Sequence, residues 1–528
     1  MKKISPATII IGFLIISNSV FACTNLLVSP GASKDGSSFL VYLNDGEWLY
    51  HLNQTPAQDH DISDSLTFRS MSGKSFKIHQ VAHTYAIIGF QMNEHQLSIG
   101  ETTFLGREEL WDKEQPLKYW ELMRLALLRA KTAREAIKVM TSLADTYGYG
   151  SEGETFSLAD PREAWLLEMI GTGGKGGAVW VARRVPDGYI TAHANHSRIG
   201  RVPTDDPENC LYSDNYKQFA IDAGIFNPNE GVDFRFNDVY DPPSTAHLKY
   251  TETRVWSIFR RAAPSQEFSS AYNRNLKGSE TYPLFIKPDK KLSLKDVFSL
   301  IRDHYEGTEF DMRKDMAAGP SGNPNRPRPL EWEINAARYS WERPVSTYNT
   351  AFSFVAQMRE FLPDEIGGIC WFAVDDTYTN CYFPIYCNNT QIPEAFTKGD
   401  IKHYSPESAW WAFNYVANFA MLRYNLMVED IKSVQQTLED GFINQQKGIE
   451  TAALSLDKQD RIDFLSAYSA YAGRKVHKAW VELGELLVSK YNDGYVKDPE
   501  NNIISKSYSK EYLNKIVEQE GDRYKIDD

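Results

Sequence analysis

The sequence lacks a long apolar run outside its first residues, and a helix needs about 20 apolar residues to cross a bilayer, so we expect no membrane span. It also lacks an excess of positive charge: 57 Lys and Arg stand against 70 Asp and Glu, for a formal net charge of −13. This balance argues against a nucleic-acid partner, because phosphate binding depends on clustered cations. What remains is an ordinary globular composition in 528 residues, enough for one large core or two domains.

Common hydrolase and nucleotide-binding motifs are also missing. No G-x-S-x-G elbow occurs, which argues against an ordinary serine hydrolase. No H-E-x-x-H occurs, and His193 and His196 have no third ligand at a suitable spacing, so we expect a polar loop there and no metal. Residues 171–176 match G-x-G-x-x-G, but a β-like run follows at 178–182 where a helix would be required. The sequence therefore predicts a glycine-rich hairpin loop and no nucleotide cofactor.

Cysteine is scarce, and the position of the first one is informative. The chain has five cysteines, an odd number that leaves at least one thiol unpaired if the protein is exported. Cys23 follows a Met-Lys-Lys start, a short apolar stretch at 7–16 and the small residue Ala22, which together predict a secretory signal peptide over 1–22. We expect export to a periplasm or outright secretion. The other cysteines could pair as disulfides or remain buried thiols, and the sequence leaves this open: Cys210, Cys370, Cys381 and Cys387.

Cleavage after Ala22 would give Cys23 a free α-amine beside its own thiol. An α-amine has a pKa of about 7.7–8, so near neutral pH it can accept the thiol proton. One residue then supplies both nucleophile and general base, as in N-terminal nucleophile hydrolases. An alternative is acylation of Cys23 as a bacterial lipoprotein, although Phe21 is an unusual residue in that motif; the protein would then be a lipid-anchored binding protein without turnover.

The pattern of apolar residues predicts an α+β fold. Strands at 23–29 and 37–43 flank an Asp-Gly turn, and a hairpin of this kind places Asn44 and Asp45 near the Cys23 thiol. Residues 117–130 and 132–146 have helical periodicity. Further strands are expected at 76–81, 85–91, 155–158, 164–170, 178–184, 189–194, 368–374 and 382–386. Residues 263–345 should form long loops, and helices should dominate after about 400, one beginning at Ser405-Pro406 and another covering 464–490.

An ordered set of short motifs resembles peptidase family C69, the cysteine dipeptidases. The motifs lie at 23–28, 32–37, 149–153, 160–165, 192–195, 197–199, 254–256, 317–320, 322–324, 384–386 and 409–414, with Trp371 and Cys381. The resemblance implies an αββα sandwich of the N-terminal nucleophile hydrolases and hydrolysis of a peptide or amide bond without metal or organic cofactor. We expect a catalytic domain over 23–398 and a helical C-terminal region over 399–528 packed on it.

The resemblance also implies roles for individual residues. Cys23 matches the nucleophile, and Asp45 matches an acidic residue that holds the amine and thiol. Asn195 matches the residue whose amide N–H helps to form the oxyanion hole, and Arg254 is the candidate cation near the reacting centre. The related acylases carry an Arg three positions before the acidic residue, where this chain has Tyr42, so the positive charge would have to come from elsewhere.

The function indicated is that of an exported cysteine dipeptidase acting on small peptides. A dipeptide has two charged ends, and Glu101 could bind its ammonium while Arg198 binds its carboxylate. The alternative enzyme is an N-terminal Cys amidase that acts on non-peptide amides, such as bile-salt or acyl-amino-acid conjugates. A homo-oligomer is compatible with the sequence.

Overall fold

The computed structural model describes residues 22–329 and 331–526, so the predicted signal peptide lies outside the described residues. Two antiparallel sheets form the body of the protein. The six-stranded sheet has the order β14 (Ile190–His193), β1 (Ala22–Val28), β2 (Ser38–Asp45), β18 (Thr350–Met358), β19 (Ile369–Val374), β20 (Phe383–Tyr386). The eight-stranded sheet has the order β15 (Cys210–Tyr212), β13 (Ala178–Arg184), β12 (Ala164–Gly171), β11 (Gly153–Ala159), β10 (Ser98–Phe104), β9 (Met92–Asn93), β8 (Ile87–Ile88), β3 (Gln54–Thr55).

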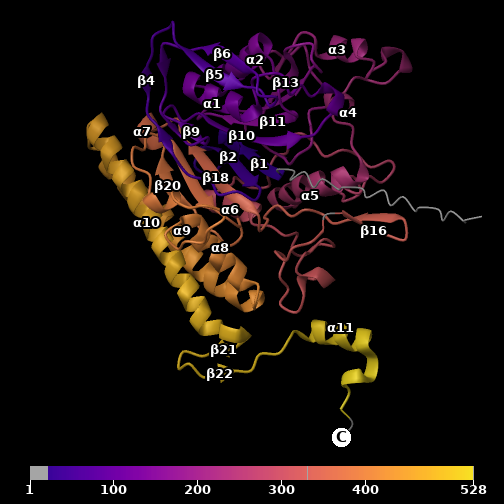
Figure 1. Ribbon diagram of the computed structural model, residues 1–528, viewed down its shortest axis with the longest axis vertical. Coiled ribbons are helices and arrows are strands. Elements are labelled where there is room, and N and C mark those ends of the chain that lie inside the picture. Colours follow the sequence, from indigo (N-terminus) through magenta and orange to yellow (C-terminus); the bar gives the residue numbers. More distant parts are fainter. Residues whose placement is uncertain (1–21, 330, 527–528) are drawn as a thin grey trace, which may run out of the picture.

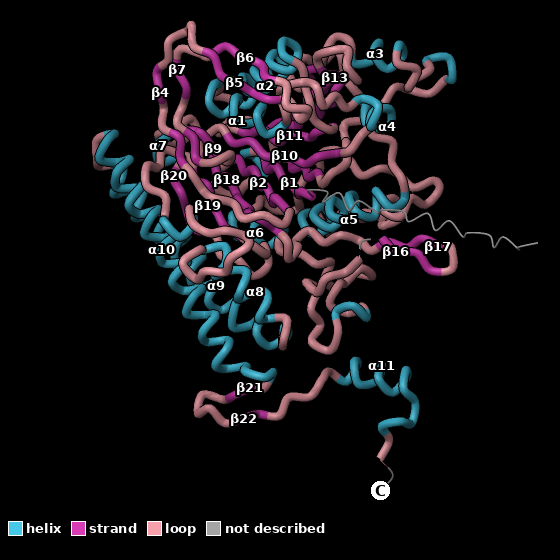
Figure 2. Tube along the Cα trace, viewed as in Figure 1, coloured by secondary structure: helices cyan, strands magenta, loops and turns pink. Residues whose placement is uncertain are grey.

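The two sheets pack face to face, with β1 and β2 against β10 and β11. Helices α1 (Tyr119–Arg129) and α2 (Ala133–Tyr147) cover the outer face of the eight-stranded sheet (Figure 1). On the other side, α5 (Thr245–Ala262) packs on β14, and α8 (Ala409–Ala420), α9 (Tyr424–Leu454) and α10 (Lys458–Tyr491) pack on β19 and β20. Figure 2 shows the strands lying between these groups of helices. The predicted α+β class is confirmed.

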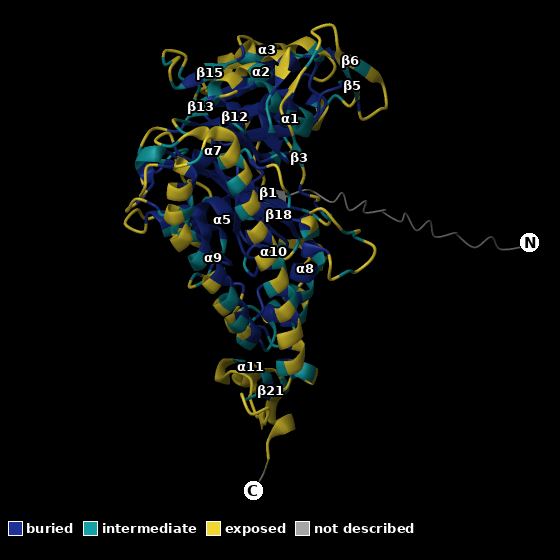
Figure 3. Cartoon of the chain, turned by 90° about the vertical axis from the view of Figure 1, so that its left-hand side faces the viewer, coloured by how far each residue is buried: buried dark blue, intermediate teal, exposed yellow. Residues whose placement is uncertain are grey.

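Smaller elements surround this sandwich. The helices are α3 (Tyr216–Asp222), α4 (Phe236–Tyr240), α6 (Leu294–Ile301), α7 (Asp364–Gly367) and α11 (Lys510–Glu520). Four two-stranded sheets among the described residues pair β4 (Gln58–Asp59) with β7 (His83–Thr84), β5 (Ser65–Arg69) with β6 (Ser75–His79), β16 (Glu331–Ile334) with β17 (Ala337–Ser340), and β21 (Val496–Lys497) with β22 (Ile503–Ile504). The segment from β21 to α11 extends beyond the helical layer (Figures 1 and 3). None of the described helices combines the length and apolar character that crossing a membrane demands.

Most of the predicted strands and helices are confirmed, with shifted boundaries. The glycine-rich segment after Gly171 is a hairpin loop, since β12 and β13 pair antiparallel across it. The prediction of loops throughout 263–345 was wrong in part, because α6 lies inside this segment. Ser293 and Asp296 cap its start reciprocally, a local signal that the high content of Pro and Gly obscured. The predicted helix start at Ser405-Pro406 was wrong, and helix α8 begins at Ala409. Ser405 does not cap this helix, because its hydroxyl accepts a hydrogen bond from Glu407 N in the preceding turn.

Aromatic packing joins α10 to the rest of the core. The Trp480 side chain is fully buried, and its ring stacks on Phe413 of α8 with 4.6 Å between ring centroids. Figure 3 shows that the inner faces of these helices are buried and their outer faces exposed. The C-terminal helices thereby continue the core of the six-stranded sheet.

We predict that Trp480→Ala lowers the free energy of unfolding by about 3–5 kcal/mol, because it removes a large buried ring and leaves a cavity. The matched control is Tyr471→Ala, since Tyr471 lies on the same helix with a side chain that is 50% exposed. The control should stay within about 0.5 kcal/mol of the wild type. Chemical denaturation followed by circular dichroism measures both, and equal effects of the two substitutions would contradict this account of the core.

Candidate active site

Cys23 lies on β1, between β14 and β2 of the six-stranded sheet, with its side chain on the face that meets the other sheet. It sits near the start of β1, whose antiparallel register with β2 places Asn44 directly opposite it. The predicted hairpin and the proximity of Asn44 are thus confirmed. Residues two apart on a strand share a face, so Tyr42 lies on the same side as Asn44. The Cys23 side chain is fully buried between the sheets.

Three polar groups surround the thiol. Glu101 Oε1 of β10 lies 3.4 Å from Cys23 Sγ, the Tyr42 hydroxyl 3.8 Å and Asn44 Nδ2 3.7 Å. Tyr42 donates a short hydrogen bond to Glu101 and accepts one of 2.6 Å from Asn44. Burial raises the pKa of the Cys23 thiol well above its usual value, and the charges of Glu101 and Asp45 raise it further. The thiol is therefore neutral at physiological pH and needs a base to become a nucleophile.

Asn195 contacts the backbone nitrogen of Cys23. It occupies the turn after β14 with a φ of 62°, in the left-handed region that Asn tolerates better than most residues. Its Oδ1 accepts a hydrogen bond of 3.1 Å from Cys23 N, and its Nδ2 donates one of 2.8 Å to the Thr103 carbonyl. The predicted proximity to Cys23 is present, but the amide N–H expected at an oxyanion faces Thr103. In this structure Asn195 holds the nitrogen of Cys23.

Arg254, on α5, contacts both Cys23 and Asn195. Its guanidinium is fully buried and donates to the Cys23 carbonyl at 2.7 Å and to Thr24 Oγ1 at 2.9 Å. It also donates to Asn195 Oδ1 at 3.0 Å. Burial lowers the pKa of Arg254 to about 10, so the group keeps its charge at neutral pH. The structure thus brings the predicted cation beside Cys23.

Asp45 is tied to a partner that the sequence analysis missed. Arg343, which lies in the segment before β18, forms a 2.5 Å ion pair with Asp45 Oδ2. Thr350 donates to Asp45 Oδ1, also at 2.5 Å. The carboxylate therefore bonds these two side chains, while a backbone hydrogen bond involving Asp45 lowers the pKa of the Cys23 thiol. Arg343 supplies a positive charge beside Asp45, and no local motif marked it, because it comes from a distant part of the chain.

The two residues predicted to bind the substrate, Glu101 and Arg198, lie in different places relative to Cys23. Glu101 lies against the Cys23 thiol, as described above. Arg198 donates instead to the carbonyls of Ala192 at 2.8 Å and Pro283 at 2.9 Å, and it lines a separate cavity of about 230 Å³. This position gives no support to a role for Arg198 in binding a substrate at Cys23.

Glu154 of β11 forms a second acidic group beside Glu101, which the sequence analysis did not identify. Burial and the charge of Glu101 raise the pKa of the Glu154 carboxyl well above its usual value. Burial thus favours the protonated form of Glu154, which lies next to the Glu101 carboxyl that contacts the thiol.

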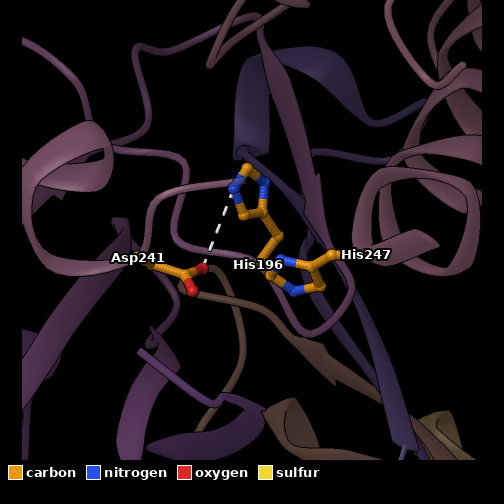
Figure 4. Close-up of side chains that lie close together, drawn as sticks. All are labelled: His196, Asp241 and His247. Carbon is orange, nitrogen blue, oxygen red and sulfur yellow. Dashed lines mark ion pairs between the residues drawn. The ribbon is translucent and has the colours of Figure 1, made fainter. Parts of the chain in front are cut away.

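The remaining cysteines do not form disulfides. All five cysteines lie in the described part of the chain and are buried free thiols. Behind Asn195 lies a cluster of residues of the types that bind metals, formed by His196, Asp241 and His247 (Figure 4).

Comparison with known proteins identifies the family to which the chain belongs. The model of peptidase family C69 matches residues 22–437, a span that contains each of the site residues described above. A "Probable dipeptidase" of Salmonella dublin is 27% identical over 401 residues, covering 72% of this chain and 84% of that protein. A "Probable dipeptidase" of Latilactobacillus sakei is 23% identical over 89% of this chain and 95% of its own length. A "Probable dipeptidase B" of Lactococcus lactis is 26% identical over 70% of this chain and 71% of its own length. The chain belongs to peptidase family C69.

Proposed function

We propose that the protein is an exported cysteine dipeptidase of the N-terminal nucleophile type, made active by removal of residues 1–22. The observation that carries this proposal is the hydrogen bond between Cys23 N and Asn195 Oδ1. After cleavage the same nitrogen would be an α-amine, attached to the residue that bears the thiol. The relatives are named as probable dipeptidases, which supports the substrate class. The two packed antiparallel sheets with helices outside them fit the sandwich expected of this hydrolase type.

The reaction begins with proton transfer within Cys23. The α-amine accepts the thiol proton, directly or through one water, and the thiolate attacks the scissile carbonyl carbon. Asn44 Nδ2, which lies 3.7 Å from Sγ, is the side-chain donor best placed for the resulting oxyanion. The C–N bond then breaks as the protonated amine gives its proton to the leaving amine. Water attacks the thioester with the same amine as base, which releases the acid and restores the thiol.

Arg254 and Asn195 prepare the amine for this role. Asn195 Oδ1 fixes the position of the nitrogen, and the guanidinium of Arg254 lies beside both residues. A nearby positive charge disfavours protonation of an amine and so lowers its pKa. The free base is thus available near neutral pH, where an ordinary α-amine with a pKa of about 7.7–8 would be mostly protonated.

Glu101 is the proposed ligand of the substrate ammonium. In a dipeptide the ammonium nitrogen lies about 2.5 Å from the scissile carbonyl carbon, because one Cα separates them. A substrate carbonyl at Cys23 Sγ therefore has its ammonium within reach of Glu101 Oε1, which is 3.4 Å from that sulfur. A charge-assisted hydrogen bond of this kind would favour substrates with a free N-terminus.

We predict that Cys23→Ala in correctly processed protein lowers dipeptide hydrolysis by at least about a thousandfold, because it removes the nucleophile. Cys210→Ala is the matched control, since Cys210 is another buried free thiol and lies at β15. Activity of the wild type should fall as the pH drops below the amine pKa, because a protonated amine cannot act as base. Turnover by Cys23→Ala protein would rule out the mechanism.

The same preparation tests the alternatives. Mass spectrometry of the mature N-terminus should find a bare amine on Cys23, and a diacylglyceryl group there would support the lipid-anchored binding protein instead. A panel of dipeptides and acyl-amino-acid conjugates separates a dipeptidase from an amidase, and preference for the conjugates would contradict the proposed substrate class.

We predict that Glu101→Gln raises KM for free dipeptides at least about tenfold, because it removes the charge that pairs with the ammonium. The change should be much smaller for N-acetylated dipeptides, which have no ammonium. Glu154→Gln is the control, since Glu154 is the neighbouring acidic residue and burial, by raising its pKa, favours the neutral form that Gln resembles. Steady-state kinetics on both substrate types measures the difference, and equal losses on the two would show that Glu101 does not bind the ammonium.

A further inference from the structure

Three side chains that the proposed chemistry does not use meet behind the Asn195 turn. His196 follows Asn195, Asp241 follows α4, and His247 lies in the first turn of α5. One ligand atom of each lies within 4.8 Å of the others, and His196 Nε2 is 3.7 Å from Asp241 Oδ2 (Figure 4). The spacing in the sequence hid this group, because its members come from three separate segments.

The His196 ring has an unsatisfied nitrogen. The residue is 1% exposed, and its Nε2 has no hydrogen-bond partner among the described residues. The other nitrogen, Nδ1, lies 3.3 Å from Glu252 Oε1. A carboxylate accepts an N–H there, so Nδ1 carries the proton of a neutral ring and Nε2 points a lone pair at Asp241. A buried lone pair facing a carboxylate is unfavourable unless a cation lies between them. His193, by contrast, has both nitrogens paired, with Thr102 and Ser157.

The hydrogen bond of His247 leaves one nitrogen available in the same way. Its Nε2 lies 2.9 Å from the backbone oxygen of Asn195. A carbonyl oxygen only accepts, so this nitrogen carries the proton and Nδ1 keeps its lone pair. Histidines that bind metals usually donate their other N–H to a carboxylate or a backbone carbonyl. His196 has the carboxylate of Glu252 as this partner, and His247 has the backbone carbonyl of Asn195.

Asp241 is held in position by the backbone. Its Oδ2 accepts a hydrogen bond of 2.9 Å from Ser197 N, and its Oδ1 accepts one of 3.3 Å from Gly106 N. Each carboxylate oxygen can accept more than one bond, so Oδ2 remains able to bind a cation. All three candidate ligands are thus oriented by neighbouring groups.

We propose that His196 Nε2, Asp241 Oδ2 and His247 Nδ1 bind a divalent transition metal of the zinc class. Two imidazoles and one carboxylate suit zinc, and water would complete a tetrahedral site. Ligands at about 2.0–2.2 Å from a tetrahedral zinc lie about 3.3 Å apart, so the side chains must close in on the ion. His247 is partly exposed, whereas His196 and Asp241 are buried.

The proposed role of the ion is structural. It would connect the turn after β14 to α5 and fix the His247 tautomer that bonds the Asn195 backbone. Asn195 in turn holds Cys23 N, so the ion would help to position the amine without touching the substrate.

The test is metal binding by the processed full-length protein after removal of metal with a chelator. Titration with zinc chloride should show about one ion bound per chain and a rise of several degrees in the unfolding temperature, because the ion binds the folded state. Cobalt chloride should give the visible absorption bands of a tetrahedral site. The absence of stoichiometric binding in the wild type would overturn the proposal and leave a proton as the group between His196 and Asp241.

Variants locate the ion. His247→Gln should weaken zinc binding more than about tenfold, while His403→Gln, which removes an exposed histidine paired with Asp400, should not change it. Cys23→Ala should bind zinc as the wild type does, which distinguishes this site from chelation by the N-terminal amine and thiol. Unchanged binding by His247→Gln, or loss of binding in Cys23→Ala alone, would refute the assignment.

Discussion

The arrangement of the site depends on one buried cation, the guanidinium of Arg254. It is fully buried and bonds the carbonyls of Cys23 and Ala194, the Thr24 hydroxyl and the carboxamide of Asn195. Burying a charged group costs free energy unless its donors form hydrogen bonds. Here acceptors at the start of β1 and just after β14 form those bonds. The start of β1, the turn after β14 and helix α5 are thereby held as one unit, which fixes the backbone of Cys23.

Near the unit held by Arg254, the core contains more polar side chains than the core of an ordinary β-sandwich. Two packed sheets normally enclose apolar side chains, yet here buried polar groups gather around a thiol: Tyr42 and Glu101 contact it, and Glu154 lies beside Glu101. Burial is the main reason that the pKa values of Cys23 and Glu154 are both raised, and the charge of Glu101 raises both further. Such grouping costs stability, and its concentration at one end of β1 is typical of a catalytic centre.

The sequence predicted the features that depend on local signals. The Asp-Gly turn and its flanking strands placed Asn44 opposite Cys23, and the structure has that register. The central strands β10 and β18 and helix α5 were not predicted, although Glu101 and Arg254 lie on two of them. A strand buried on both faces has no alternation to detect. Arg343 could not be found at all, because its pairing with Asp45 depends on the tertiary fold.

The hydrogen bond from Cys23 to Asn195 has a consequence for the timing of activity. While residue 22 is still attached, Cys23 N is a peptide nitrogen, which donates this bond equally well but has no lone pair that can accept a proton. The precursor can therefore fold with the thiol, the guanidinium and the acidic pair already in place, and yet be inert. Under the proposed chemistry, a single cut converts this latent zymogen into an enzyme without any rearrangement. The cell that makes it would be protected from its hydrolysis until the leader is removed.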